Sequence, residues 1–152
     1  MFSNKKVLVA TDFAESSRAA ADVALELAQT FKVPLVLVHA YNLPTYIYTG
    51  VPFVPVEDYL RSYEEAAREL LEKERARLAE KGVEVSAVLR NGIAWEEILS
   101  TAHRSGAGLI VMGTHGRRGL PRALLGSVAE KVVRMSTVPV LTIHDTEHAH
   151  AS

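Results

Sequence analysis

The chain has 152 residues, 17 basic and 18 acidic side chains, a formal net charge of −1 and no cysteine. This length fits one domain, and domains of about this size bury roughly 68 to 70% of the surface of the unfolded chain, so the core needs no disulfide or metal to stabilise it. The small net charge gives no electrostatic reason to expect nucleic acid or an anionic membrane as a partner, and the absence of cysteine excludes thiol catalysis, disulfide bonds and cysteine-ligated zinc.

The N-terminal apolar run is too short for a signal peptide, and no other apolar run approaches the ~20 residues that span a bilayer. We therefore expect a cytoplasmic protein, with one domain over residues 1–145 and a flexible tail over residues 146–152. The last nine residues, HDTEHAHAS, contain His144, His148 and His150. This spacing could hold a metal weakly, but a solvated tail is the simpler interpretation.

Strand and helix patterns alternate along the chain. The β-branched run at residues 7–10 predicts a first strand, and apolar positions at helical spacing from Ala20 to Phe31 predict a helix after it. The continuous apolar run at residues 33–40 is typical of a strand that is buried on both faces of a parallel sheet. The irregular segment 41–57 is longer than an ordinary connection, and it could be a lid, a contact surface or a packed loop.

A charged helix follows, with apolar side chains on one side and an expected end at Gly82. Residues 83–89 predict a third strand, and a shorter helix should end near Gly106. Residues 109–112 and 138–143 predict the fourth and fifth strands. This order of elements predicts an α/β fold, an open parallel five-stranded sheet of the Rossmann-like type with helices on both faces.

Ligands of such sheets bind beyond the carboxyl ends of the strands, where the strand order reverses. If the first strand is central and the fourth lies beside it, the turns after Ala10 and Met112 meet at that point. These turns contain Asp12 and Gly113. We therefore expect a ligand site there.

The chain contains neither G-x-x-x-x-G-K-[ST] nor G-x-G-x-x-G, so the two common phosphate-binding motifs are absent. Its own glycine pattern is G-x-x-G, nine residues and then G-S, formed by Gly113, Gly116, Gly126 and Ser127. Glycine can adopt positive φ and allows backbone N–H groups to approach a ligand closely. Ser127 should open a helix, and a helix N-terminus favours an anion such as phosphate.

This pattern, with an aspartate just after the first strand, resembles the universal stress protein family in the branch that binds ATP. The likeness extends from VLVATDF near the N-terminus to VPVLTI near the C-terminus. It implies a small α/β domain with strand order 3-2-1-4-5, usually a dimer, that binds ATP together with Mg²⁺. Adenine would lie near the first two strands, and the phosphates would lie in the glycine loop.

The resemblance also implies which residues contact the nucleotide. Asp12 and Ser127 are the plausible partners of a Mg²⁺ ion carried by ATP. Ile93 departs from the family pattern, in which proline often stands at this position, but it affects no expected ligand contact. The expected nucleotide-binding residues are Ala10, Thr11 and Asp12 after the first strand, Val38, His39 and Ala40 along the adenine, and Met112, Gly113, Gly116, Arg117, Gly126, Ser127 and Val128 around ribose and phosphates.

Each of these residues also has a structural interpretation. Asp12 with Glu15, and Ser127 with Glu130, have the spacing of helix capping pairs, and Ser127 could cap with its hydroxyl while neighbouring N–H groups face a ligand. The glycines could serve as turn residues alone.

The basic and imidazole side chains near the expected site are equally ambiguous. Arg117, Arg118 and Arg122 could pair with phosphate or remain solvated. His39 and His115 lie near the expected crevice, and a hydrogen-bonded structural histidine is more common than a catalytic one.

The expected function is that of an ATP-binding regulatory protein of the stress response, with slow hydrolysis at most, because no general base is evident for phosphoryl transfer. A genuine ATPase or phosphotransferase, and a dimeric adaptor that binds no nucleotide, are the alternatives. The downstream protein partner is not readable from the sequence.

The resemblance and the apolar character of the fifth strand both favour a homodimer through Val138 to Ile143, because an exposed apolar edge strand is an aggregation hazard unless it is paired. If the backbone of Pro139 faces away from the fourth strand, Leu141 and Ile143 should donate outward to a partner.

Overall fold

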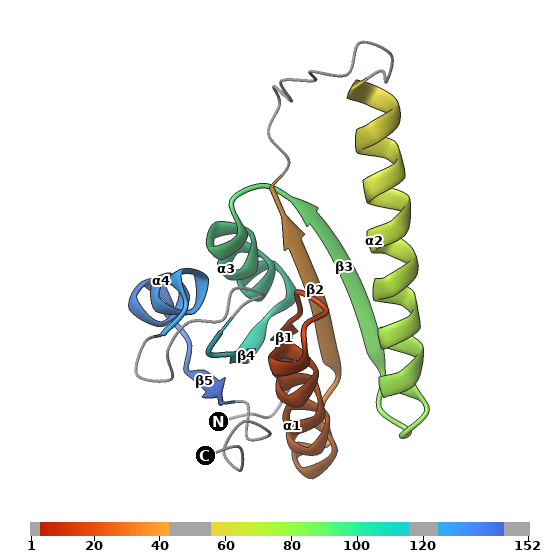
Figure 1. The fold of residues 1–152 in the computed structure, drawn as a ribbon. Coiled ribbons are helices and arrows are strands. Elements are labelled where there is room, and N and C mark those ends of the chain that lie inside the picture. The colour runs from red at the N-terminus through yellow and green to blue at the C-terminus, as the bar shows by residue number, and fades with distance from the viewer. Residues whose placement is uncertain (1–3, 43–55, 116–124, 145–152) are drawn as a thin grey trace, which may run out of the picture.

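The computed structural model describes residues 4–42, 56–115 and 125–144. Within them, parallel strands alternate with helices, and the strands form a sheet of order β3-β2-β1-β4-β5 (Figure 1). The predicted fold class and the strand order implied by the resemblance are thus both confirmed. The elements are β1 Lys6–Ala10, α1 Glu15–Phe31, β2 Leu35–Tyr41, α2 Val56–Ala79, β3 Val85–Asn91, α3 Ala94–Ser105, β4 Ala107–Gly113, α4 Ser127–Met135 and β5 Val140–Ile143.

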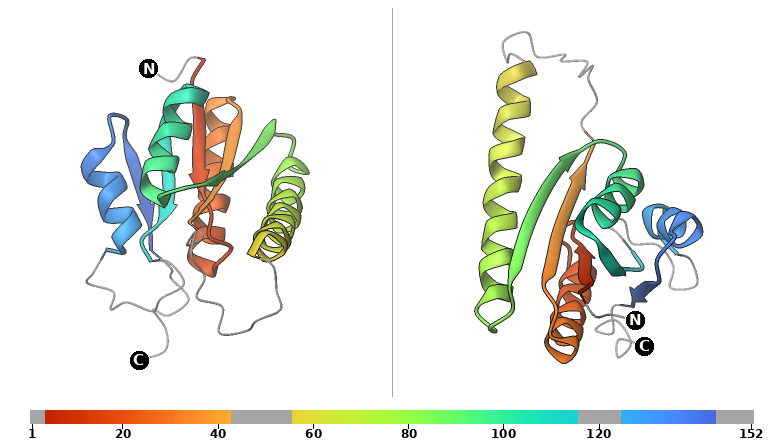
Figure 2. Two further views of the ribbon diagram at one scale, coloured as in Figure 1. Left: turned by 90° about the horizontal axis from the view of Figure 1, so that it is seen from above. Right: turned by 180° about the vertical axis from the view of Figure 1, so that it is seen from behind.

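Two helical layers cover the sheet. Helices α1 and α2 pack on one face, and α3 and α4 pack on the other, as the view from above in Figure 2 shows. Side chains alternate along each strand, so Val7 and Val9 of β1 enter the first core while Leu8 enters the second. These three residues are fully buried, which is why the central strand reads as an uninterrupted apolar run.

Three of the strands begin later than their apolar runs predict, whereas β1 and β4 begin earlier, at Lys6 and Ala107. The runs at 33, 83 and 138 were expected to start strands, whereas pairing starts at Leu35, Val85 and Val140. Val33, Val83 and Val138 still pack against the cores. An apolar residue can therefore be buried in the approach to a strand before its backbone joins the ladder.

Residues in the left-handed backbone region follow two of the helices. Gly106 follows α3 with φ of 73°, as the sequence predicts for a glycine at a helix end. Lys32 takes the same role after α1 with φ of 56°. Helix α2 ends at Ala79, and Gly82 lies in the following turn with φ of 84° instead of directly at the helix end.

The backbone direction of β5 is opposite to the one expected. The N–H of Ile110 donates to the carbonyl of Pro139 at 3.0 Å, and the N–H of Thr114 donates to the carbonyl of Ile143 at 3.0 Å. Backbone direction alternates along a strand, so residues 139, 141 and 143 face β4, and Val140 and Thr142 face the open edge. Pro139 is tolerated because it precedes the first paired residue of the strand.

None of the helices within the described residues is long and apolar enough to cross a membrane. Three predicted features lie outside these residues: most of segment 41–57, the arginine-containing part of the glycine loop at 116–124, and the tail at 146–152 with His148 and His150. His144 is described, and its Nδ1 lies 3.3 Å from the Thr114 hydroxyl.

Candidate functional site

A cavity of about 550 Å³ lies at the carboxyl ends of β1 and β4, on the face of the sheet that carries α3 and α4. This is the switch point at which the chain leaves the central strands toward opposite sides, and the volume falls within the range of small-molecule sites. Its lining residues are Ala10, Thr11, Asp12, Ser17, Ala40, Ala94, Ile98, Met112, Gly113, Thr114, His115, Gly126, Ser127, Val128 and Ala129.

The cavity has an apolar wall and a polar end. Ala40 of β2, Ile98 of α3 and Met112 of β4 come from three elements that pack in one core. Ser127 and Val128 form the first turn of α4. Because the first N–H groups of a helix have no partner within it, this end of the cavity is suited to a negatively charged group.

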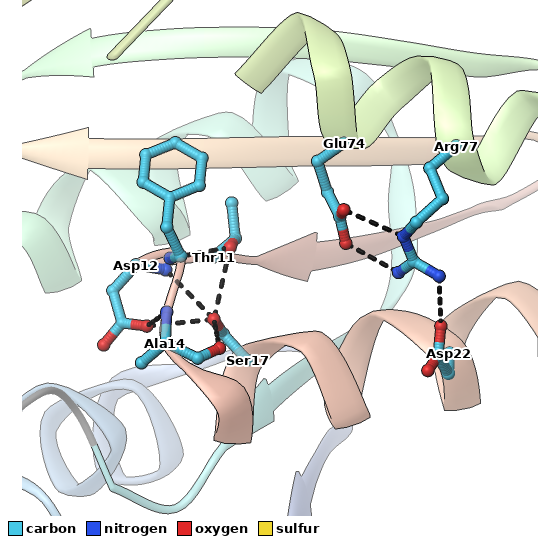
Figure 3. A network of polar contacts seen from close by, with 8 residues as sticks. Thr11, Asp12, Ala14, Ser17, Asp22, Glu74 and Arg77 are labelled. Atoms are coloured by element: carbon cyan, nitrogen blue, oxygen red, sulfur yellow. Dashed lines mark hydrogen bonds and ion pairs between the residues drawn. The ribbon is translucent and has the colours of Figure 1, made fainter. Parts of the chain in front are cut away.

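The turn between β1 and α1 is held by a network of short polar contacts (Figure 3). The N–H of Ala14 donates to Asp12 Oδ1 at 2.9 Å, and the Ser17 hydroxyl lies 2.9 Å from the same oxygen. The Thr11 and Ser17 hydroxyls are 3.2 Å apart, and the N–H of Asp12 donates to Ser17 Oγ at 3.4 Å. The carboxylate of Asp12 is therefore fixed at the rim of the cavity.

The predicted capping pair of Asp12 and Glu15 is wrong in its details. Helix α1 begins at Glu15 with Ala14 as its N-cap, and no side chain caps it. Asp12 instead receives the N–H two residues further along, which is the geometry of an Asx turn. Its carboxylate therefore stabilises the approach to the helix while it also lines the cavity.

The capping pair of Ser127 and Glu130 is likewise not formed. Gly126 is the N-cap of α4, Ser127 is the first helical residue, and the cap has no side-chain hydrogen bond. Glu130 pairs with Arg134 at 3.3 Å on the helix surface. Among the described residues, no capping side chain thus satisfies the first-turn N–H groups of α4.

Two glycines of the motif, Gly113 and Gly126, line the cavity but lack the positive φ that was expected of them. A Cβ on Gly113 would lie 2.9 Å from Ser16 Oγ and 3.1 Å from the carbonyl carbon and oxygen of Ser16. Gly126 has φ of −60°, and its N–H donates to the carbonyl of Thr114 at 2.7 Å. Among the described glycines, positive φ occurs at Gly82 and Gly106. Positive φ was therefore the wrong reason for these two glycines, and Gly113 serves the packing of β4 against α1.

Two residues expected to line the adenine lie elsewhere. Val38 is fully buried in the core of the α3 and α4 face and does not line the cavity. His39 donates from Nδ1 to the carbonyl of Thr11 at 2.7 Å, and its ring packs 4.5 Å from that of Phe13. Gly116 and Arg117 lie outside the described residues, so their expected contacts stay predictions.

The cavity includes residues that the sequence did not indicate. Thr114 is 1% exposed, its N–H and hydroxyl both lie near the carbonyl of Ile143, and its own carbonyl accepts from Gly126. It therefore joins the ends of β4, β5 and α4. His115 follows it, and its carbonyl accepts from the Ser16 hydroxyl at 2.5 Å. The residues added by the structure are Ser17, Ala94, Ile98, Thr114 and Ala129, and His115 lines the cavity as its expected place near the crevice predicts.

The sequence offered one indication of Thr114, which is its position between Gly113 and Gly116 of the glycine motif. The contribution of α3 follows from the way it crosses the sheet, which no local motif encodes. Within the described parts of the chain, no three His, Cys, Asp or Glu side chains form a cluster that could hold a metal ion.

These features define an open α/β domain of the doubly wound class, with a small-molecule cavity at the switch point of its sheet. The sequence profile of the Universal stress protein family matches residues 3–144. The chain therefore belongs to the universal stress protein family.

Relatives match over nearly their whole length. Universal stress protein YxiE of Bacillus subtilis is 35% identical over 144 residues, covering 91% of this chain and 97% of the relative. Universal stress protein MJ0577 of Methanocaldococcus jannaschii is 31% identical, covering 91% and 94%. The solved structure of MJ0577 has a TM-score of 0.74 to this chain at 30% identity and covers 94% of this chain and 97% of its own.

Proposed function

We propose that this chain binds ATP in the cavity at the switch point and acts as a nucleotide-dependent regulatory protein of the stress response. The observation that carries the proposal is the division of the cavity between an apolar wall, at Ala40, Ile98 and Met112, and the first turn of α4. A nucleotide has the same division between its base and its phosphates. The cavity volume of about 550 Å³ suits a ligand of this size.

The adenine would pack on the apolar wall, and the phosphates would accept hydrogen bonds from N–H groups of Ser127 and Val128. Asp12, held at the rim by Ala14 and Ser17, would contact the hydroxyl groups of the ribose. These contacts use side chains and backbone groups that already lie around one cavity, so binding requires little rearrangement of the described residues.

Mg²⁺ would arrive with the triphosphate. The carboxylate of Asp12 and the hydroxyl of Ser127 are oxygen donors on the lining, the ligand type that Mg²⁺ prefers. Because the described residues hold no cluster of three ligands, most of the coordination would come from phosphate oxygens and water.

Two proteins of the same fold were solved with adenine nucleotides. One is a universal stress protein from Archaeoglobus fulgidus in complex with dAMP, at 24% identity, with a TM-score of 0.64 and with 94% of this chain and 99% of its own covered. Another universal stress protein was solved in complex with cAMP, at 24% identity, with a TM-score of 0.70 and with 92% and 97% covered. This identity establishes the shared fold alone, and the two ligands make adenine nucleotides the first compounds to test.

We propose binding with slow hydrolysis at most. Rapid phosphoryl transfer needs a group that positions the attacking water and others that stabilise the developing charge. Among the described lining residues, Asp12 and His115 are the titratable ones, and the Asp12 carboxylate is already engaged by the turn before α1. This arrangement favours a sensor of nucleotide over a fast enzyme.

Isothermal titration calorimetry of the purified chain with ATP and Mg²⁺ tests the proposal. We expect ATP to bind with a micromolar Kd, and tripolyphosphate to bind at least tenfold more weakly because it lacks the base. ADP, AMP, cAMP and GTP in the same series define the preference. A chain that binds no adenine nucleotide contradicts the proposal, and multiple rapid turnovers of labelled ATP would replace the regulator with an ATPase.

We also propose a homodimer through β5. This strand is the edge of the sheet, and Leu141 on it is 37% exposed. The backbone N–H groups of Val140 and Thr142 face the open edge, where a second copy of the strand can accept hydrogen bonds from them.

A further inference from the structure

A second cavity, of about 520 Å³, lies between α1 and α2 on the opposite face of the sheet from the first. The turn before α1 forms one wall, through Phe13 and Ala14, and the C-terminal half of α2 forms the other. Figure 3 shows this turn together with Glu74 and Arg77 of α2, which extend toward α1. The volume again lies in the range of small-molecule sites.

One ion-pair cluster fixes the separation of the two helices. Arg77 of α2 donates to Glu74 at 2.7 Å through Nη2 and to Asp22 of α1 at 2.8 Å through Nη1 (Figure 3). The hydrogen bond with Glu74 is the main reason why the pKa of Arg77 is raised above its ordinary value. Arg77 stays charged and divides its charge between Glu74, which lines the cavity, and Asp22, which does not.

The remaining charges of the lining favour an anion. Arg18 of α1 and Lys73 of α2 both line the cavity, from its two walls. Glu80 is the remaining acidic group of the lining once Glu74 is paired with Arg77. The lining thus contains three basic and two acidic groups, and its two basic groups outside the ion-pair cluster, Arg18 and Lys73, come from the two helices that enclose the space.

The same cavity has an apolar surface. Leu70 is 47% exposed although it lines the cavity, and Phe13 contributes an aromatic ring. Phe13 has φ of 66°, a region that bulky residues rarely adopt, and its ring packs 4.5 Å from the ring of His39. Backbone conformations of this kind concentrate at ligand sites and switch regions.

We propose that this second cavity binds a small amphipathic organic anion. Its carboxylate or sulfonate would lie between Arg18 and Lys73, and its apolar part would pack on Phe13 and Leu70. Neither the basic groups nor the apolar surface alone selects a ligand, but together they exclude free metal cations, neutral sugars and purely apolar compounds. Binding at this cavity does not require a bound nucleotide.

The occupant would also change the affinity for nucleotide, an effect that rests on the proposed function. Thr11 lines both cavities. The N–H of Phe13 donates to Thr11 Oγ1 at 3.0 Å, and the N–H of Ala14 donates to Asp12 Oδ1 at 2.9 Å. A ligand that presses on Phe13 or Ala14 therefore acts on the residues that orient Asp12 in the first cavity.

Fluorescence titration with 8-anilinonaphthalene-1-sulfonate, an aryl sulfonate, tests the site in the full chain. We expect saturable binding of one molecule with a micromolar Kd, and at least a fivefold increase of the Kd in Arg18→Gln and in Lys73→Gln. Arg61→Gln and Lys81→Gln are the matched controls, because both residues are exposed and lie outside the lining. The controls should keep the wild-type Kd.

The outcomes separate the two sites. Absence of saturable binding, or one Kd across all four variants with wild-type thermal unfolding, overturns the second site. An ATP affinity that saturating sulfonate leaves unchanged, in a chain that binds both compounds, overturns the coupling through Thr11. A chain that binds the sulfonate as described but binds no ATP overturns the proposed function and leaves the second site supported.

Discussion

Asp12 combines a structural and a binding role in one carboxylate. Its Oδ1 accepts from the Ala14 N–H and lies beside the Ser17 hydroxyl, and the residue lines the first cavity. Both contacts require an acceptor oxygen but no negative charge. The charge and the hydrogen-bonding role can therefore be separated by substitution.

We expect Asp12→Asn to weaken ATP binding about tenfold, since a contact with a charged group contributes about 1.5 to 3 kcal/mol, while the melting temperature changes little because the amide oxygen accepts the same two hydrogen bonds. Asp12→Ala is the comparison, because it removes the acceptor and should lower stability by about 1 kcal/mol. Calorimetry and thermal unfolding on both variants give the readout. Loss of stability in Asp12→Asn with intact affinity would assign the carboxylate to the turn alone.

Gly113 lines the first cavity and also lies close to the backbone of α1. We expect Gly113→Ala to destabilise the fold by about 1 to 3 kcal/mol, because the new methyl group would press on the backbone of Ser16. The double variant Gly113→Ala with Ser16→Ala removes the contact to Oγ but not those to the carbonyl group, so it should recover only part of the loss. Denaturant unfolding measures both. A Gly113→Ala chain as stable as the wild type would mean that α1 and β4 separate easily.

At the scale of elements, the start of α4 is the part of the site that depends on backbone geometry. Gly126 has φ of −60° and ψ of 155°, a conformation that suits the residue before a proline. Ser127 is the first helical residue, where proline is well tolerated. A backbone donor can therefore be removed from the cavity without breaking the helix.

Ser127→Pro should keep the melting temperature within about 2 °C of the wild type, since proline fits this position, and should weaken ATP about tenfold by removing one N–H and the hydroxyl. Ser127→Ala removes the hydroxyl alone, so the difference between the two variants reports the N–H. Equal ATP affinity of both variants would show that the phosphates do not use this backbone donor.

Apolar runs and their order were enough to predict the strands, their parallel arrangement and the end of the sheet at which the first cavity lies. The details of the helix starts were not predictable, because Asp12 with Glu15 and Ser127 with Glu130 have the spacing of capping pairs that the backbone does not form. The close approach of Gly113 to Ser16 joins residues far apart in the sequence, and no local pattern encodes it.

At the scale of the whole molecule, the alternation of backbone direction along β5 decides which backbone groups a second copy can reach. The sequence placed a proline near the start of this strand but could not show which way its carbonyl points. Because the carbonyl of Pro139 accepts from the N–H of Ile110, the outward donors are Val140 and Thr142 instead of Leu141 and Ile143.

Val140→Pro should therefore raise the dimer dissociation constant at least tenfold, because it removes an outward N–H while leaving the bonds between β4 and β5 in place. Leu141→Pro should instead lower the stability of each subunit, since the N–H of Leu141 faces β4. Light scattering at micromolar concentration and thermal unfolding distinguish the two. A monomeric wild-type chain would refute the dimer. A dimer weakened by Leu141→Pro but not by Val140→Pro would refute the assignment of Val140 and Thr142 as the outward donors.

The sheet also divides the chain into connections that can and cannot change in length. At the amino ends of the strands, Gly106 alone separates α3 from β4, and its left-handed backbone leaves no room for another residue without a shift of the helix. At the carboxyl ends, the chain uses residues 42–55 to pass from β2 to α2 and 114–126 to pass from β4 to α4. The two longest connections thus both leave the sheet at the rim that carries the cavity, so we expect differences in chain length between family members at this rim and not within the sheet.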